Sequence, residues 1–480
     1  MTNRRAWFGV FLAAFVLSRL GSAIHYIEDP DSLRFALAVQ RYSLVDHRPH
    51  FPGYPVFCGV VWTISRALGG FAAGFSLVGA LAGFTLAWTS GRIAQRAKIS
   101  REFQLAWWFL LPLPWLLANR YMPDLMGAAL AWWIHDALAN PETSRHRRRA
   151  AFVLAGMAPG VRLSIAPLLL PSLLAALAGR SLEAPRRAHR VGPGPALGYT
   201  ALGLLSWFIP VVLLTGPSTL LALGVEQFTG HFTDFGGSIW TESAPWPRVT
   251  MLTQTLLADG LGAGWLGRHW LTWGVSLSLA LISLLALGNR NRGSALEPPS
   301  PALRAAAVAA GIYLIWIFLG QNLLHKSRHV LPLLPPLTLL FGLWHQRLPR
   351  HLFPGALSGA LLTFTGIVTF TLVEQHRHPS AMAQAVERVS SLAETETVLV
   401  LADPLVQHFF SAQRAGQRFQ LPEDSPGLQM ASRPSRVDRI VSIGRPAPTL
   451  GLPIAQHSTF FHNPFVNRLW PQVELYEYQP

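Results

Sequence analysis

The sequence predicts an all-α polytopic membrane protein that carries a small α/β domain after its last membrane helix. Half of the 480 residues are hydrophobic, 13% are charged, and the mean hydropathy is +0.31. The apolar residues come in blocks of about twenty, the length with which a helix crosses a bilayer. At about residue 374 these blocks give way to short strand-like runs, which predict a separate α/β domain.

The charge of the chain fits a membrane protein better than a nucleic-acid binder. The net charge is +15, and most of it comes from arginines in short loops between apolar blocks, where membrane topology explains it. We therefore expect no nucleic-acid partner. Cys58 is the single cysteine, which excludes a disulfide framework and a cysteine zinc site.

The apolar blocks predict about eleven spans with a cytoplasmic N-terminus. The first block has a basic tip and small residues near Ala23, as a cleaved secretory signal does, but it leads straight into further spans, which favours a retained helix. The blocks lie at 6–26, 71–90, 103–118, 123–140, 149–161, 163–179, 196–215, 268–287, 304–320, 329–345 and 352–373. The basic loops then fall on one side: Arg92, Arg96, Lys98 and Arg101; Arg145 to Arg149; Arg180, Arg186, Arg187 and Arg190; Arg290, Arg292 and Arg304; and Arg347 and Arg350.

Two long loops are predicted on the outer side. The run 56–70 is apolar, but counting it as a span would put the Arg92 loop on the wrong side, so we expect an interfacial or re-entrant helix. The outer loop 28–70 then holds two helices, DSLRFALAVQRYSL and VFCGVVWTISRAL, joined by the tight turn PGYP. A second outer loop spans 216–267 and is rich in aromatic residues.

The tail from 374 to 480 forms the second predicted domain, and residues 1–373 the first. ETVLVLAD, VDRIVSIG and VELYEYQ are expected to form strands, and PLVQHFFSAQRAG a helix. No phosphate loop or nucleophile motif is found in this tail. We expect a lid or a stabilising cap on the extracytoplasmic side.

The ionisable residues that topology does not explain all fall on the outer side. Such groups near a membrane are costly and are kept mostly for functional sites. The candidates are Glu28, Asp29, Asp31, Asp46, His50 and Tyr54 on the first loop, Asp124 and Arg162 at the ends of spans, His231 and Asp234 on the second loop, and Lys326 and Arg328 before the tenth span.

Each candidate also has a structural explanation. The acids could simply be solvated, Asp124 could cap a helix, and His231 could be an ordinary loop residue. Lys326 and Arg328 lie on the predicted outer side, where the positive-inside tendency predicts few Lys and Arg. Their presence there favours a functional role such as phosphate binding. A carboxylate and cations at a wet, apolar boundary suit glycosyl transfer from a lipid-linked sugar phosphate. The departing phosphate needs little protonation, so one carboxylate base and cationic phosphate holders suffice.

The segment 31–55, DSLRFALAVQRYSLVDHRPHFPGYP, resembles the first outer loop of the membrane-embedded GT-C glycosyltransferases. The likeness is to bacterial relatives of the protein O-mannosyltransferases (glycosyltransferase 39-like) and of the aminoarabinose and dolichyl-phosphate-mannose-type enzymes. PHFPGYP stands where that family has a His-Pro-Pro-like motif, and MPDLMGAALA, GVRLSIAPLLLP, GHFTDFGGS and QNLLHKSRHVLPLLPPL resemble its later landmarks. The resemblance covers the membrane part to about residue 345.

The resemblance implies an inverting transferase of the bacterial plasma (inner) membrane that moves a hexose or pentose from a polyprenyl-phosphate donor to a lipid, glycan or protein acceptor. By this resemblance the catalytic base is Asp31 or Asp29. The family has a single acidic residue at this place, whereas this chain has three, the third being Glu28. Arg162, Lys326 and Arg328 become the phosphate holders. An acceptor or lipid groove is assigned to Asp46, His50, Tyr54, Asp124, His231 and Asp234. No metal site is indicated, although some relatives use a divalent cation and others do not.

Two other functions compete with this one. A transporter or flippase of a lipid-linked or anionic substrate would show internal repeats and ionisable groups at mid-membrane. No convincing repeat is found, and the charges gather at one face. A lipid-linked-oligosaccharide ligase or polymerase shares the donor, but it usually places its key residues on a late outer loop, whereas here the first loop carries the strongest signal.

Overall fold

The chain folds into two compact units, one helical and one containing a small sheet. The computed structural model describes residues 2–184, 191–242, 244–290, 299–348, 354–413, 419–420 and 437–479. The first unit comprises Met1–Ala23 and Arg34–Glu374, and the second comprises Ile24–Leu33 and Gln375–Pro480. The second unit therefore contains a short early segment of the chain as well as the tail.

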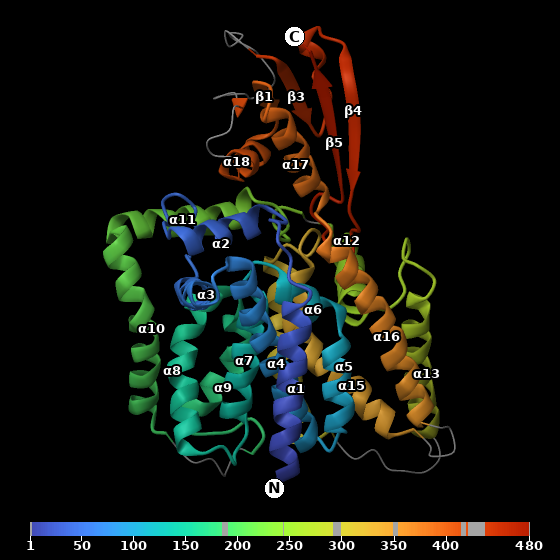
Figure 1. Ribbon diagram of the computed structural model, residues 1–480. Helices are drawn as coiled ribbons and strands as arrows, with labels where there is room; N and C mark the ends of the chain where they lie inside the picture. The colour runs from blue at the N-terminus through green and yellow to red at the C-terminus, as the bar shows by residue number, and fades with distance from the viewer. Residues whose placement is uncertain are drawn as a thin grey trace. The chain divides into compact units, whose positions relative to one another are not determined.

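The first unit is a bundle of helices (Figure 1). Two helices, α2 (Pro30–Gln40) and α16 (Pro354–Arg377), run from one unit into the other. The other helices of the first unit are α1 (Thr2–Leu20), α3 (Pro55–Leu68), α4 (Phe71–Arg96), α5 (Arg101–Leu110), α6 (Pro112–Asn119), α7 (Asp124–Ala139), α8 (Arg145–Val161), η1 (Leu163–Ile165), α9 (Ala166–Leu177), α10 (Pro193–Thr215), α11 (Pro217–Thr233), α12 (Pro245–Gln254), η2 (Thr255–Gly260), α13 (Thr272–Arg290), α14 (Pro301–Gly320), η3 (Ser327–Leu333) and α15 (Leu334–Gln346).

Each of the eleven apolar blocks contains helix, as in a multi-pass membrane protein, although the first block is helical only to Leu20 and the block 268–287 only from Thr272. The block 103–118 is divided between α5 and α6 at Leu111, because Pro112 lacks the N–H that a continuous helix needs. Among the described residues, four helical segments are long and apolar enough to cross a bilayer: Phe71–Arg96, Pro193–Thr215, Pro301–Gly320 and Pro354–Ala393, the last of which begins with α16. Of the basic residues assigned to one side, Arg186, Arg187, Arg190, Arg292 and Arg350 lie outside the described residues.

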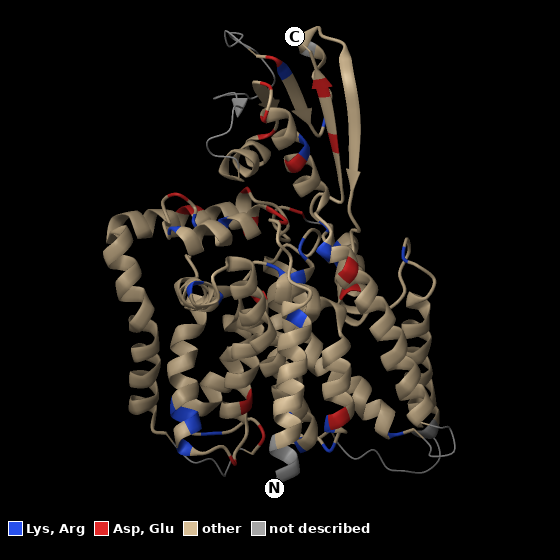
Figure 2. Ribbon diagram, in the orientation of Figure 1, with Lys and Arg blue, Asp and Glu red and all other residues tan. Residues whose placement is uncertain are grey.

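Charged residues gather at the two ends of the helices of the first unit, and few lie between (Figure 2). This distribution follows from the cost of placing a charge among apolar side chains. The two ends are therefore the places where polar chemistry can occur. The direction of α7 defines them: its first residue is Asp124, and the buried Asp136 lies close to its other end.

The predicted pair of helices in the segment 28–70 is confirmed as α2 and α3. The first helix ends at Gln40 rather than Leu44, because Ser43 pairs with Arg48 in a tight hairpin. The turn before α3 places Gly53 at φ +88° and Tyr54 at φ +47°. A Cβ on Gly53 would lie 2.2 Å from the hydroxyl of Tyr42, so the turn requires glycine.

The second unit is built on a five-stranded sheet of order β2-β1-β3-β5-β4. The strand β1 (Val398–Leu401) pairs in parallel with β2 (Phe419–Gln420) and β3 (Arg439–Ile443), while β5 (Gln472–Tyr478) is antiparallel to β3 and to β4 (Ile454–Phe461). The predictions of β1, β3, β5 and the helix α18 (Pro404–Gln413) are confirmed. The strands β2 and β4 and the helix α17 (Ala381–Ala393) were not predicted.

Candidate functional site

Three helix ends of the first unit bring a carboxylate and two guanidinium groups together. Asp124 opens α7, Arg162 follows α8, and Arg328 lies in η3, shortly after α14. Nη1 of Arg162 lies 2.6 Å from Oδ1 of Asp124, and Nε of Arg328 lies 3.4 Å from the same oxygen. Asp124 is buried, with 3% of its surface exposed, so both ion pairs are largely removed from water.

The local sequence explains why Asp124 and Arg162 meet. A carboxylate in the first turn of α7 is stabilised by the positive end of the helix dipole. Asp124 does not cap the helix, because the N-cap residue is Pro123 and the structure records no side-chain cap there. One turn later, a Cβ on Gly127 would lie 2.9 Å from Cβ of Arg162, so glycine at this position allows the arginine to lie against α7.

The imidazole of His329 lies beside these ion pairs. Its Nδ1 is 3.2 Å from Nη2 of Arg162, and Lys326, Arg328 and His231 lie within electrostatic range of the ring. We call Asp124, Arg162, Lys326, Arg328 and His329 the Asp124 cluster. It contains three side chains that carry positive charge and one carboxylate.

The backbone that carries Arg328 and His329 is held in place by two buried side chains. The hydroxyl of Tyr313, on α14, donates to the carbonyl of His329 at 3.0 Å. Nε1 of Trp132, on α7, donates to the carbonyl of Pro332 at 2.9 Å. Because η3 is fixed at both of these points, its cationic side chains project from a well-defined backbone.

The three acids of the early segment belong to the second unit and have different surroundings. Glu28 is fully buried and lies 3.3 Å from Nε2 of His376. Asp29 is 5% exposed and accepts the backbone N–H of Ser32 at 2.7 Å, as a residue preceding a helix commonly does. Asp31, in the first turn of α2, is half-buried.

The remaining predicted residues do not form one group. Nε2 of His50 lies 3.2 Å from the hydroxyl of Tyr54, and both rings pack against Phe35 of α2. Asp46 is exposed on the hairpin after α2, and Asp234 is exposed at the end of α11. The structure thus brings Asp124, Arg162 and Arg328 together, with Lys326 and His231 in the surroundings of His329, and leaves Asp46 and Asp234 on exposed loops.

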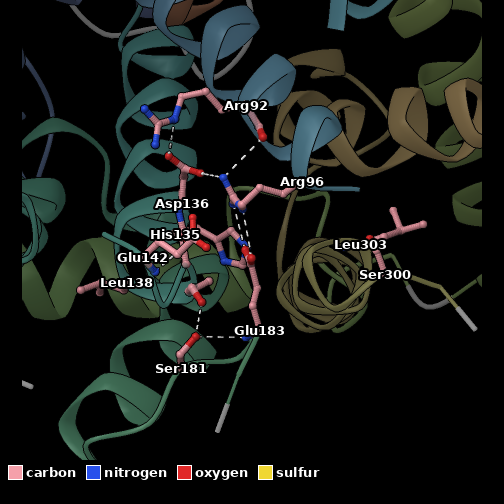
Figure 3. Close-up of polar contacts among 12 residues, drawn as sticks. Arg92, Arg96, His135, Asp136, Leu138, Glu142, Ser181, Glu183, Ser300 and Leu303 are labelled. Carbon is pink, nitrogen blue, oxygen red and sulfur yellow. Dashed lines mark hydrogen bonds and ion pairs between the residues drawn. The ribbon is translucent and has the colours of Figure 1, made fainter. Parts of the chain in front are cut away.

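At the other end of α7, a second set of charges surrounds Asp136 (Figure 3). The fully buried carboxylate lies 2.6 Å from Arg96, 2.6 Å from Arg147 and 3.1 Å from Arg92. Arg96 is also 2.9 Å from Glu183. We call these five residues the Asp136 network. Each of its carboxylates is paired, which is typical of a structural network.

Sequence reasoning missed several residues that shape these sites. A signal existed for Asp136, since an acid within the apolar block 123–140 is unusual. Arg248 is a buried arginine of the second predicted outer loop. It could have been noticed, because the positive-inside tendency does not explain an arginine there. Tyr313 had none, since one tyrosine in an apolar helix most often belongs to the core. Among the described residues, no three His, Cys, Asp or Glu side chains come together as a metal-ligand set.

Comparison with solved structures identifies the fold. The chain is similar to ArnT from Cupriavidus metallidurans, an aminoarabinose transferase of the GT-C fold, in its apo state (TM-score 0.59, 13% identity, 99% of this chain and 98% of that chain). It is equally similar to the same protein bound to undecaprenyl phosphate (TM-score 0.58, 13% identity, 98% of each chain). No family model and no curated protein sequence matches the chain. The expected GT-C-like fold is therefore confirmed over nearly the whole chain.

Proposed function

We propose that the chain is a membrane glycosyltransferase that moves a sugar from a polyprenyl-phosphate donor to an acceptor on the extracytoplasmic face. The observation that carries this proposal is the convergence of Arg162 and Arg328 on Asp124, with Lys326 and His329 in the same cluster. The fold supports it, because ArnT, which shares the fold, has been seen bound to undecaprenyl phosphate.

The Asp124 cluster would hold the phosphate of the donor. A guanidinium group presents parallel N–H donors that match two oxygens of a phosphate, and an ammonium adds a compact charge. Without donor, Asp124 keeps Arg162 and Arg328 in place, so that they do not have to be ordered on binding. Three positive charges against one carboxylate leave an excess that favours an anionic ligand.

The chemical step would be a single displacement at the anomeric carbon. The acceptor oxygen forms a bond to that carbon while the bond from carbon to the phosphate oxygen breaks. The electron pair leaves with the polyprenyl phosphate, whose charge the cluster stabilises. The acceptor proton passes to a carboxylate, and attack from the opposite face inverts the configuration of the sugar.

Among the three acids of the early segment, we assign the base to Asp31. Glu28 is fully buried beside His376, and Asp29 is buried and binds the start of α2. A base must reach the acceptor, and Asp31 is the most accessible of the three. We further propose that the chain lies in a bacterial plasma membrane, with a cytoplasmic N-terminus and the second unit outside.

Binding of undecaprenyl phosphate to the purified chain in nanodiscs tests the phosphate site. We expect Arg162→Gln to weaken binding by about 10- to 100-fold, because a desolvated charge-assisted pair contributes about 1.5–3 kcal/mol. Arg304→Gln is the matched control, since Arg304 is exposed near the opposite end of α14. Equal affinity of wild type and Arg162→Gln would contradict the proposal. Binding followed by movement of the lipid across the bilayer, without sugar transfer, would favour a flippase.

A further inference from the structure

The second long loop of the first unit binds the last carbonyls of α14. The final four carbonyls of a helix have no partner within the helix. Here each acceptor is a backbone carbonyl oxygen. Nε of Arg248 donates to the carbonyl of Phe318 at 2.9 Å, and the backbone N–H of Ile239 donates to that of Leu319 at 2.9 Å. Nε2 of His231 donates to the carbonyl of Gly320 at 2.5 Å. All three donors come from residues 231–248, which comprise the last turn of α11, the loop after it and the first half of α12.

Arg248 is the centre of this arrangement. Its side chain is fully buried, and its guanidinium also donates to the carbonyl of Gln321 at 2.9 Å, of Ile317 at 3.5 Å and of Gly237 at 2.6 Å. Burying a guanidinium among carbonyls is costly unless its donors are satisfied, and the negative end of the helix dipole adds to the compensation. A neutral side chain could not make these bonds at once.

The same loop also contacts the turn that follows α14. Gly237 has φ +86°, and a Cβ on it would lie 2.2 Å from Cγ of Asn322. Asn322 in turn accepts the backbone N–H of His325 through its side-chain oxygen at 3.0 Å. The residue after His325 is Lys326, the first member of the Asp124 cluster. Contacts therefore run without a gap from Arg248 to the start of the cluster.

We propose that Arg248 is a positioning residue for the donor phosphate: by binding the end of α14 and the loop backbone at Gly237, it fixes the turn that presents Lys326 and Arg328. This inference rests on the proposed function, because it assigns the cluster to a phosphate. It explains why the second loop carries an arginine that topology does not require. Arg248 itself does not touch the substrate in this account.

Equilibrium binding of undecaprenyl phosphate to the full chain in nanodiscs tests the inference. We expect Arg248→Gln to raise the Kd by about tenfold, the effect of a coupled residue outside a binding site. Arg148→Gln is the matched control: Arg148 is a buried arginine that donates to the carbonyls of Leu138 and Asn140, near the other end of α7. It should lose stability but keep the Kd of wild type.

A second variant keeps the test decisive if Arg248→Gln does not fold. Gly237→Ala pushes on Asn322 from the loop side, so it should also raise the Kd. In the transfer reaction, both variants should lower kcat/KM for the donor, because the cluster both binds the phosphate and stabilises it as it leaves, whereas Arg148→Gln should keep the kcat/KM of wild type. An unchanged Kd in the folded variants, or an equal rise in Arg148→Gln, would overturn the inference.

The same measurements separate this inference from the proposed function. If wild type binds the lipid and Arg162→Gln does not, while Arg248→Gln and Gly237→Ala bind like wild type, only the positioning role fails. If wild type does not bind undecaprenyl phosphate at all, the phosphate site itself fails, and the positioning role fails with it.

Discussion

Asp124 and Arg162 depend on each other for their burial. Each is less than one-tenth exposed, and their ion pair is short, at 2.6 Å. Removing the charge of one leaves the other in an environment that penalises it, which usually costs more than the intact pair contributes. The cluster is therefore both a proposed binding site and a structural element of the first unit.

Asp124→Asn tests this dependence. We expect the free energy of unfolding to fall by about 3 kcal/mol, because Arg162 loses its buried partner. Unfolding of the purified chain in increasing mole fractions of SDS would measure the change. Asp234→Asn is the control, since Asp234 is exposed at the end of α11 and should change stability little. Equal stability of Asp124→Asn and wild type would show that the ion pair contributes nothing.

At the scale of elements, α8 and α10 lie side by side and pack through two glycines (Figure 1). A Cβ on Gly203 would lie 1.9 Å from the carbonyl oxygen of Val153, and one on Gly156 would lie 2.0 Å from that of Thr200. Nε1 of Trp207 donates to the carbonyl of Gly156 at 3.0 Å. Small residues at such a crossing allow two membrane helices to approach closely.

Gly203→Ala should separate these helices. We expect a loss of about 1–3 kcal/mol, because the added methyl group overlaps backbone atoms of α8 that cannot move independently. Gly198→Ala, in the same helix, has no atom within 4 Å of the added Cβ and should be neutral or slightly stabilising. Faster amide hydrogen exchange in α10 of Gly203→Ala alone would agree with this packing, and equal exchange in both variants would contradict it.

In the second unit, a charged pair joins the end of α17 to the sheet. The hydrogen bond from the Arg439 guanidinium, on β3, holds the pKa of the Glu396 carboxyl below its ordinary value of 4.5. A carboxyl whose pKa is lower in the folded state stabilises that state above its unfolded pKa. The contribution is lost as the pH falls through the folded pKa.

The stability of β1 and β3 should therefore decrease in acid below about pH 4.5. Glu396→Gln should remove the part of this pH dependence that comes from Glu396. Hydrogen exchange of the full chain at pH 6 and at pH 3.5, compared between wild type and Glu396→Gln, measures the difference. Because Glu396 is partly exposed, we expect a small effect. If hydrogen exchange changes between pH 6 and pH 3.5 by the same amount in wild type and in Glu396→Gln, the pair of Glu396 and Arg439 is not the source of the pH dependence.

Elements were predictable where hydrophobic periodicity is strong. The apolar blocks and the strands VLVL and RIVSI have patterns that solvent and packing dictate locally. The strand β4, IAQHSTFF, is mostly exposed and has no clear alternation, so its pairing with β5 decides its structure. The helix α17, which was not predicted, lies between the last apolar block and the sheet, where the composition of the sequence changes.

At the scale of the whole molecule, α7 joins two polar ends with different roles. Asp124 and Asp136 lie about 18 Å apart along this helix, at 1.5 Å per residue. The Asp136 network pairs each of its carboxylates with arginines, whereas the Asp124 cluster holds one carboxylate among several cations. We infer that the end of α7 at Asp136 is structural and that the end at Asp124 binds a ligand.

Asp136→Asn separates these roles. We expect it to lower the free energy of unfolding by about 3–5 kcal/mol, because three arginines lose a buried partner. In the fraction that remains folded, the affinity for undecaprenyl phosphate should equal that of wild type. Unfolding in SDS and lipid binding on the same preparation measure the two properties. A loss of affinity as large as that of Arg162→Gln would show that the two ends are not independent.

The candidate site was predictable in part, for a physical reason. The positive-inside tendency accounts for most arginines, so Lys326 and Arg328 stood out. The tendency does not say which of the outstanding residues meet, because that depends on how the ends of α7, α8 and α14 pack. Glu28 and Asp29 show the same limit: their sequence position resembles that of Asp31, but burial distinguishes them.

Sugar transfer by the purified chain in nanodiscs tests directly whether the chain is a glycosyltransferase. Radiolabelled polyprenyl-phosphate sugars serve as donors, a membrane extract serves as the source of acceptor, and wild type is compared with Asp31→Asn and Asp29→Asn. We expect wild type to transfer the sugar, and Asp31→Asn to bind the donor but transfer it at least about a hundredfold more slowly, the usual contribution of a general base. Donor left unconsumed by wild type, or equal transfer by Asp31→Asn, would contradict this expectation.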